Sequence, residues 1–160
     1  MVCACIALLA GCASREAPPP FPAYTGAIAE LFDNSLSRRF LLAEAGDRLF
    51  HARLVEADTV LEARIRTVNA DTRDGIPAYQ LSLNPTRALL GALPESPLVL
   101  SVPREHPSYA MIRLGHRHLV GRRAILIIKN FTNDDGTITH HVRVEPDDAT
   151  TRGALAIVKL

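Results

Sequence analysis

The sequence predicts a mainly β domain with flanking helices, an α+β protein built on a small five-stranded antiparallel barrel. Two observations favour this class. Residues 25–57 space their apolar side chains three or four positions apart, as helices do, whereas from residue 58 onward apolar and polar side chains alternate, as in half-buried strands. Five such strands suit a small barrel better than a two-sheet sandwich, which needs about seven.

The composition is that of one folded domain. The chain has 160 residues, of which 48% are hydrophobic, and 18 Lys or Arg against 17 Asp or Glu give a net charge of +1. This combination excludes intrinsic disorder. It also argues against a nucleic-acid-binding or polybasic membrane-surface protein, and the absence of Trp removes the usual platform for stacking bases. We therefore expect no nucleic-acid partner.

The first twelve residues are not expected to be part of the folded domain. Residues 2–10 are apolar or sulfur-bearing throughout and are followed by Gly11 and Cys12. Nine residues are far short of the ~20 that a helix needs to span a bilayer, so the pattern indicates a signal peptide. No Lys or Arg precedes the apolar run, so either the amine of Met1 serves alone or translation starts upstream.

The residues Leu9-Ala10-Gly11-Cys12 resemble a bacterial lipobox. The resemblance implies that the Cys12 thiol accepts a diacylglyceryl group, that a peptidase cuts between Gly11 and Cys12, and that the new amine is acylated. Such chains together hold a protein stably at a membrane. Ala13 follows the cysteine in place of Asp, which in the enterobacterial pattern implies the outer membrane. The alternative is an ordinary secretory signal.

The cysteines and prolines divide the rest of the chain. Cys3, Cys5 and Cys12 all lie in the leader, so residues 13–160 have no disulfide, no thiolate nucleophile and no cysteine zinc site. Residues 12–24 contain four prolines and read as a polyproline-type tether. We expect residues 1–11 to be the signal peptide and residues 25–160 to form a single globular domain.

The helical part of that domain is predicted over residues 25–57. Ile28, Leu31 and Phe32 make one short apolar stripe. A second helix is expected after Asn34 and Ser35, with Gly46-Asp47 interrupting it.

The β-barrel is predicted over residues 58–145. Apolar side chains alternate in strands around residues 61–65, 79–83 and 98–102, with a turn at 71–75 and with Pro85 ending the second strand. Residues 124–128 are apolar without alternation and are expected to be buried on both faces. A fifth strand is expected at 138–145 and a short closing helix over residues 146–160, although a sixth strand there remains an alternative.

The strand-turn-strand of residues 60–84, the Gly-basic segment Leu119-Val120-Gly121-Arg122-Arg123 and the closing hairpin resemble, loosely, exported bacterial domains of the OB or netrin-like class. The resemblance covers residues 58–145. It implies binding of oligonucleotides, sugars or other proteins. Some netrin-like members inhibit metalloproteinases through a free N-terminal cysteine. Cys12 would instead be acylated and separated from the domain, so we do not expect this protein to inhibit metalloproteinases.

Six histidines suggest a metal-binding alternative. His116 and His118 would share one face of an extended segment, as a zinc or copper site requires. Only one of His140 and His141 could be a third ligand, because neighbouring strand residues point to opposite faces. Alternation places His140 on the inward face with Val142. The simpler interpretation is a solvated loop for the first pair and a hydrogen-bonded histidine at the core margin for His140.

A hydrolase is the less favoured alternative. Ser101 and Ser108 lie near Glu105 and His106 in the sequence, but no nucleophile-elbow signature surrounds them. The paired carboxylates at residues 134–135 and 147–148 are explained by a turn and a helix N-cap.

The arginines could form an anion-binding patch, since sixteen of the eighteen basic residues are Arg. Five of them could share the outer face of the barrel: Arg64, Arg66, Arg122, Arg123 and Arg143.

Together these patterns predict a membrane-anchored envelope lipoprotein with a non-catalytic binding or structural role. We expect no catalytic residues and no cofactor. The expected partners are the membrane, through Cys12, and an envelope protein or glycan.

Overall fold

A computed structural model describes residues 29–31, 43–73 and 75–158 of the chain. Within these ranges six strands form one sheet that three helices accompany, so the predicted α+β, mainly β class is confirmed. The predicted signal peptide, Cys12 and the tether lie outside the described residues. The elements are β1 (Ala29–Leu31), α2 (Ala43–Glu56), β2 (Thr59–Arg73), β3 (Ile76–Leu90), β4 (Leu98–Pro103), α3 (Tyr109–Leu119), β5 (Arg123–Thr132), β6 (Ile138–Pro146) and α4 (Ala149–Val158).

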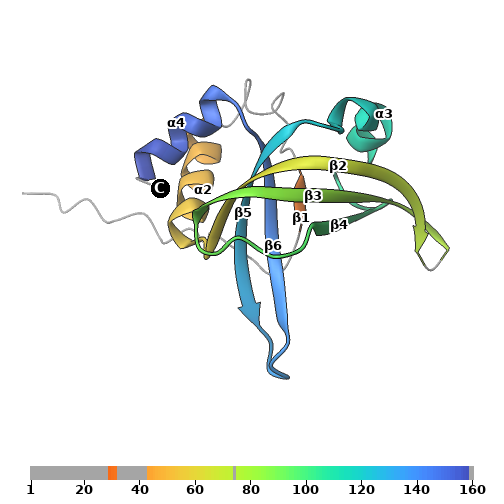
Figure 1. The fold of residues 1–160 in the computed structure, drawn as a ribbon, viewed down its shortest axis with the longest axis horizontal. Coiled ribbons are helices and arrows are strands. Elements are labelled where there is room, and N and C mark those ends of the chain that lie inside the picture. Colours follow the sequence, from red (N-terminus) through yellow and green to blue (C-terminus); the bar gives the residue numbers. More distant parts are fainter. Residues whose placement is uncertain (1–28, 32–42, 74, 159–160) are drawn as a thin grey trace, which may run out of the picture.

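The strand order is β1-β6-β5-β2-β3-β4 (Figure 1). Strands β2 to β6 pair antiparallel, and β1 runs parallel to β6. The edge strands β1 and β4 come within 8 Å of each other, Cα to Cα, but do not pair. The closed five-stranded barrel is therefore not confirmed, because the sheet stays open and gains a sixth strand.

Within the described residues, the helical prediction for residues 25–57 is right for α2 and wrong for β1; the expected start of the second helix after Asn34 and Ser35 lies outside them. Ala29–Leu31 pairs with Val142–Val144 of β6, because an edge strand offers a row of backbone N–H and C=O groups that outweighs a three-residue apolar stripe. The expected interruption at Gly46-Asp47 is also wrong, since α2 continues through both residues. A mid-helix Gly costs about 1 kcal/mol, which the burial of Phe50 and Leu54 in the same helix exceeds.

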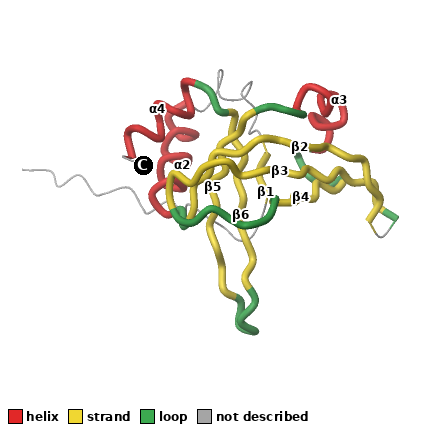
Figure 2. Tube along the Cα trace, viewed as in Figure 1, coloured by secondary structure: helices red, strands yellow, loops and turns green. Residues whose placement is uncertain are grey.

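The hairpin of β2 and β3 is longer than predicted. The turn is shorter than the one expected at residues 71–75, because Asp71–Arg73 continue β2 and pair with β3; Gly75 lies in the left-handed region, at φ 78°, as a tight turn requires. Pro85 does not end the second strand, which continues to Leu90. Pro85 faces Ala63 beside a register shift between Glu62 and Ala63, and such an irregularity accommodates a residue without an N–H. Figure 2 shows this hairpin and that of β5 and β6 extending from the body in different directions.

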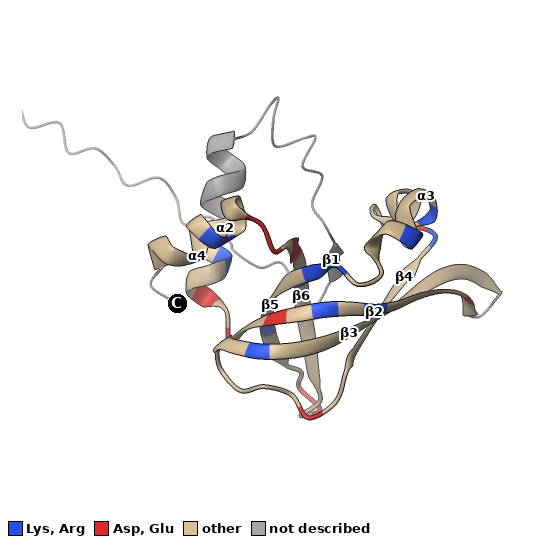
Figure 3. Cartoon of the chain, turned by 45° about the horizontal axis from the view of Figure 1, so that its top comes forward, with Lys and Arg blue, Asp and Glu red and all other residues tan. Residues whose placement is uncertain are grey.

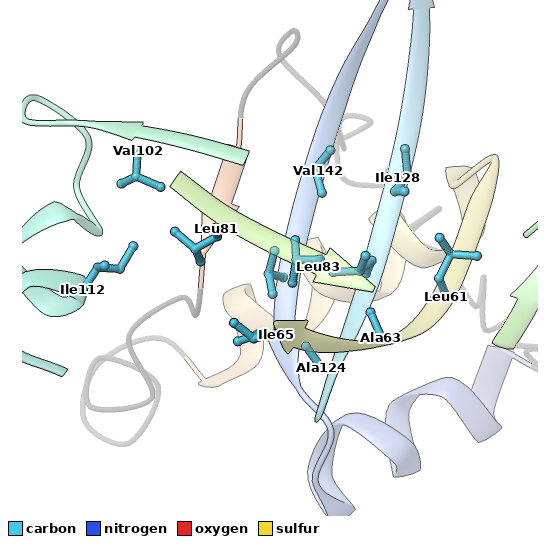
Figure 4. Close-up of a cluster of buried hydrophobic side chains, with 12 residues drawn as sticks. Leu61, Ala63, Ile65, Leu81, Leu83, Val102, Ile112, Ala124, Ile128 and Val142 are labelled. Atoms are coloured by element: carbon cyan, nitrogen blue, oxygen red, sulfur yellow. The ribbon is translucent and has the colours of Figure 1, made fainter. Parts of the chain in front are cut away.

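The hydrophobic core has two parts, one on each face of β5. Ala124, Leu126 and Ile128 point into the concave side of the sheet. Figure 4 shows Ala124 and Ile128 there among side chains of β2, β3, β4, β6 and α3. Ile125 and Ile127 point the other way, against α2 and α4. The predicted burial of residues 124–128 on both faces is thus confirmed.

Three helices cover this sheet at different places. The predicted closing helix is confirmed as α4, which contacts α2 on the convex side of the sheet. The helix α3, which the sequence interpretation missed, places Ile112 in the concave core and packs Tyr109 on Tyr79 of β3, with ring centroids 5.2 Å apart.

Candidate functional site

The histidine pair of the metal hypothesis lies on a helix. The predicted extended segment is wrong, because His116 and His118 are in the last turn of α3, where positions two apart point to different sides. The half-buried His116 ring stacks on Tyr79 at 6.1 Å between centroids, and its Nδ1 lies 3.3 Å from the carbonyl oxygen of Arg113. His118 is exposed.

The two residues of the second histidine pair, His140 and His141, lie on opposite faces of β6. His140 faces Asn130 in the β5–β6 ladder, with Nδ1 2.8 Å from the Asn130 Oδ1, and it is exposed near the end of the hairpin. The hydrogen bond expected for His140 is present, but its expected place at the core margin is wrong, because the β5–β6 hairpin extends past the core there (Figure 1). His141 is instead fully buried on the convex side of the sheet. Among the side chains that the structure describes, no three of His, Cys, Asp or Glu stand close enough to hold a metal ion.

The serine and histidine residues of the hydrolase alternative lie on β4 and in the segment that leads into α3. The backbone N–H of Ser108 donates to His106 Nδ1 at 3.0 Å, so this nitrogen serves the turn that leads into α3. Ser101 is on β4 and Glu105 is exposed in the following loop.

The carboxylate pairs have local roles, as predicted. Asp135 Oδ1 accepts hydrogen bonds from the hydroxyl and backbone N–H of Thr137, which lower the pKa of its carboxyl group. Asp148 caps α4 by accepting from the N–H of Thr151 at 2.9 Å.

Asp147 has a larger role than capping. Its carboxylate is only 5% exposed and accepts two hydrogen bonds from Arg152 of α4, at 2.5 and 2.9 Å, and one contact from Arg123 of β5 at 2.8 Å. Arg152 reaches on to Glu62 of β2 at 2.6 Å. The bond from Arg152 holds the pKa of Asp147 below its ordinary value, and the same bond raises the pKa of Arg152. This network ties α4 to two strands.

A buried charged row lies beneath α2, and the sequence interpretation missed it. Arg143 and Glu145 of β6 form a 2.6 Å ion pair with exposed side-chain fractions of 3% and 1%. The Arg143 guanidinium lies 5.6 Å from the Phe50 ring, and Arg53 of α2 is buried too. Alternation placed Arg143 correctly on the convex side, but the prediction that it shares an accessible arginine face is wrong because α2 covers that side.

The remaining arginines separate into paired and accessible groups. Arg123 is engaged by Asp147. Arg64 and Arg122 meet where α3 ends: Arg64 donates to the Gly121 carbonyl at 3.3 Å, and Arg122 donates to the His118 carbonyl at 3.2 Å. Arg66 is exposed two residues along β2.

The outer face of β2, β3 and β4 is polar. Here the side chains of alternate residues point away from the concave core, and register places Thr67 beside Ser82 and Asn69 beside Gln80. Gln80 and Ser82 in turn face Ser101 and Val99 of β4, and the Gln80 amide donates to Asp71 at 2.6 Å. Hydroxyl and amide groups therefore stand in rows across three neighbouring strands. We call this set the polar sheet face: Thr67, Asn69, Gln80, Ser82, Asn84 and Ser101.

Comparison with protein-family models, curated proteins and solved structures finds no match to this chain. In the described ranges, no helix has both the length and the apolar character needed to cross a bilayer.

Proposed function

We propose that this protein is a lipid-anchored component of a bacterial envelope, and that its domain binds an envelope glycan without catalysing a reaction. The proposal combines two parts. The lipobox-like Leu9-Ala10-Gly11-Cys12 supports attachment through acyl chains, and the polar sheet face supports recognition of a hydroxyl-rich polymer.

The strand order supports an OB-like domain. Without β1 the order is β6-β5-β2-β3-β4, that of a five-stranded Greek-key barrel left open between its third and fifth strands. Strand β1 lies in that opening, paired with β6 and close to β4 (Figure 1). OB-type domains bind oligosaccharides and oligonucleotides on the face of their second and third strands, which correspond to β3 and β4.

The class of ligand is inferred from the chemistry of the polar sheet face. Amide and hydroxyl side chains supply donors and acceptors without charge, as the hydroxyl groups of a sugar require. The rows are positioned by the strand register, and Asp71 orients the Gln80 amide. A polyanion would instead require cations, whereas none of the six residues of the polar sheet face is charged; the register adds Arg64 opposite Asn84, but also the carboxylate of Asp71 beside Gln80.

Binding can be tested by co-sedimentation of the protein with purified cell-wall sacculi. The double variant Ser82→Ala with Ser101→Ala should bind about 25-fold more weakly, since each lost hydrogen bond contributes about 1 kcal/mol. The control is Ser96→Ala with Thr150→Ala, which removes two exposed hydroxyls elsewhere and should bind like the parent. Equal binding by both double variants would contradict the proposal for this face.

The anchor is tested separately by fractionating cells that produce the Cys12→Ser variant. Without the thiol no diacylglyceryl group can be attached, so the variant should leave the membrane fraction while the parent remains there. Membranes are washed in 1 M salt, which screens charges to about 3 Å and so removes proteins held only by electrostatic attraction. Retention of Cys12→Ser after this wash would refute the anchor.

A further inference from the structure

The outer side of α3 presents an exposed leucine among arginines. Ile112, Tyr109 and His116 face the sheet, so the helix turns Arg113, Leu114, Arg117 and His118 outward. Leu114 is 81% exposed, the largest value among the exposed large hydrophobic residues of the described chain. Figure 3 shows blue and no red segments on the α3 ribbon.

The cationic character continues beyond the helix. Val120 is 49% exposed in the turn that follows α3, where Arg122 and Arg64 converge on the last carbonyl groups. We call this set the α3 surface: Arg64, Arg113, Leu114, Arg117, His118, Val120 and Arg122.

The near-neutral total charge of the chain conceals this local excess. Between Leu98 and Asn133 there are six Lys or Arg and one acidic residue, Glu105. Two of the six are engaged elsewhere, Arg123 by Asp147 and Lys129 by Asp58. The helix dipole favours cations in the last turn of α3, but it gives no reason for an exposed leucine between them.

We propose that the α3 surface docks the domain on the anionic headgroups of the membrane, with Leu114 and Val120 entering the headgroup boundary. Cationic side chains around exposed apolar ones are the pattern of a surface that lies on a bilayer without crossing it. This inference rests on the proposed anchor at Cys12, which would keep the domain beside a bilayer.

The chain length permits this arrangement. The residues from Cys12 to Ala29 can span at most about 60 Å, whereas a domain of this size is about 35 Å across. The anchor can therefore reach the bilayer whichever side of the domain faces it. A tethered surface binds at a high effective concentration, so even weak docking would orient the domain.

The test uses the full chain carrying Cys12→Ser, so that no acyl group contributes, and vesicles of phosphatidylcholine with or without 30% phosphatidylglycerol. The measured quantity is the ratio of partition coefficients between anionic and neutral vesicles, in which any contribution common to both cancels. We expect a ratio well above one that falls as salt rises.

The variants locate the surface. Arg113→Gln with Arg117→Gln should lower the ratio about 25-fold, since each arginine near an anionic surface contributes about fivefold. Leu114→Ser should lower anionic-vesicle binding about fivefold. Arg87→Gln with Lys129→Gln removes the same charge from β3 and β5 and should leave the ratio unchanged.

Three outcomes would overturn the proposal: a parent ratio of one, equal losses in both double variants, or full binding by Leu114→Ser with tight binding to a soluble polyanion. The last would identify a polyanion in place of a bilayer. The anchor is tested by cell fractionation after the salt wash, whereas the α3 surface is tested with vesicles, so failure of one proposal can be told from failure of the other.

Discussion

Helices α3 and α4 have nearly equal lengths, 11 and 10 residues, and both contain arginine, but they are held in different ways. Arg152 of α4 is bonded to Asp147 and Glu62, and so ties its helix to the sheet. In the described part of the chain, no acidic side chain pairs with Arg113 or Arg117 of α3, which is held by Ile112 and two tyrosine rings. The same residue type thus stabilises the fold on one side and faces solvent on the other.

The difference follows from where the carboxylates lie. Acidic side chains of β2, β6 and the loop before α4 stand on the side that α2 and α4 cover, and each has an arginine within contact distance: Glu62, Glu145 and Asp147. Substitutions on this side should therefore change stability, and those on the α3 surface should change binding.

The largest effect is expected from Glu145→Ala. Truncation leaves Arg143 buried and without its 2.6 Å partner, and breaking such a pair costs about 3–5 kcal/mol. The free energy of unfolding is measured in urea. The double variant Arg143→Met with Glu145→Leu should recover most of the loss, because it removes both charges and keeps apolar volume. A cost below 1 kcal/mol for Glu145→Ala would show that α2 does not depend on this pair.

A smaller loss, about 2 kcal/mol, is expected for Asp147→Asn. The carboxylate is buried, but Arg152 and Arg123 are partly exposed, so water can replace some of the hydrogen bonds that the two guanidinium groups lose. Asp134→Asn, in an exposed turn, is the control and should change stability by less than about 0.5 kcal/mol.

This loss should depend on pH with a definite sign. The pKa of Asp147 is lowered below its ordinary value of 3.8, so its contribution is complete above the unfolded pKa and is lost as the pH falls through the folded pKa. Unfolding of the parent and of Asp147→Asn should therefore differ most above pH 5 and converge below pH 4. A constant difference across this range would exclude ionisation of Asp147 as its cause.

The smallest stability effect is expected for Arg113→Gln with Arg117→Gln. Neither charge is paired within the described residues, so unfolding should change by less than about 0.5 kcal/mol while vesicle binding falls. A loss above 1 kcal/mol, measured in the same urea titration, would mean that the α3 surface supports the fold.

Several elements could be predicted from sequence because their pattern is local. Alternation placed Leu61, Ala63 and Ile65 in the core, and unbroken apolarity placed residues 124–128 between two layers. The β1 strand and the continuation of β3 past Pro85 were missed, because both depend on a partner strand. The sequence did contain a signal for α3, namely Ser108 followed by Tyr109, Ile112, His116 and Leu119 at helical spacing, but Gly115 and the histidines obscured it.

The candidate site shows the same division. The hydroxyl and amide side chains of the polar sheet face are visible in the sequence as the polar half of alternating strands, yet their cross-strand rows depend on register shifts near Ile65. Arg143 could be placed on a face by alternation, but nothing local indicates that α2 covers it.

The sequence by itself determined the class of fold, the alternation that sorts side chains between two faces, and the lipobox-like pattern that predicts an anchor at Cys12. The tertiary structure alone decided that the sheet stays open with β1 beside β6, and which arginines are buried, paired or exposed. The physical reason is that periodicity records which face a side chain occupies, whereas the environment of that face depends on elements that are distant in the chain.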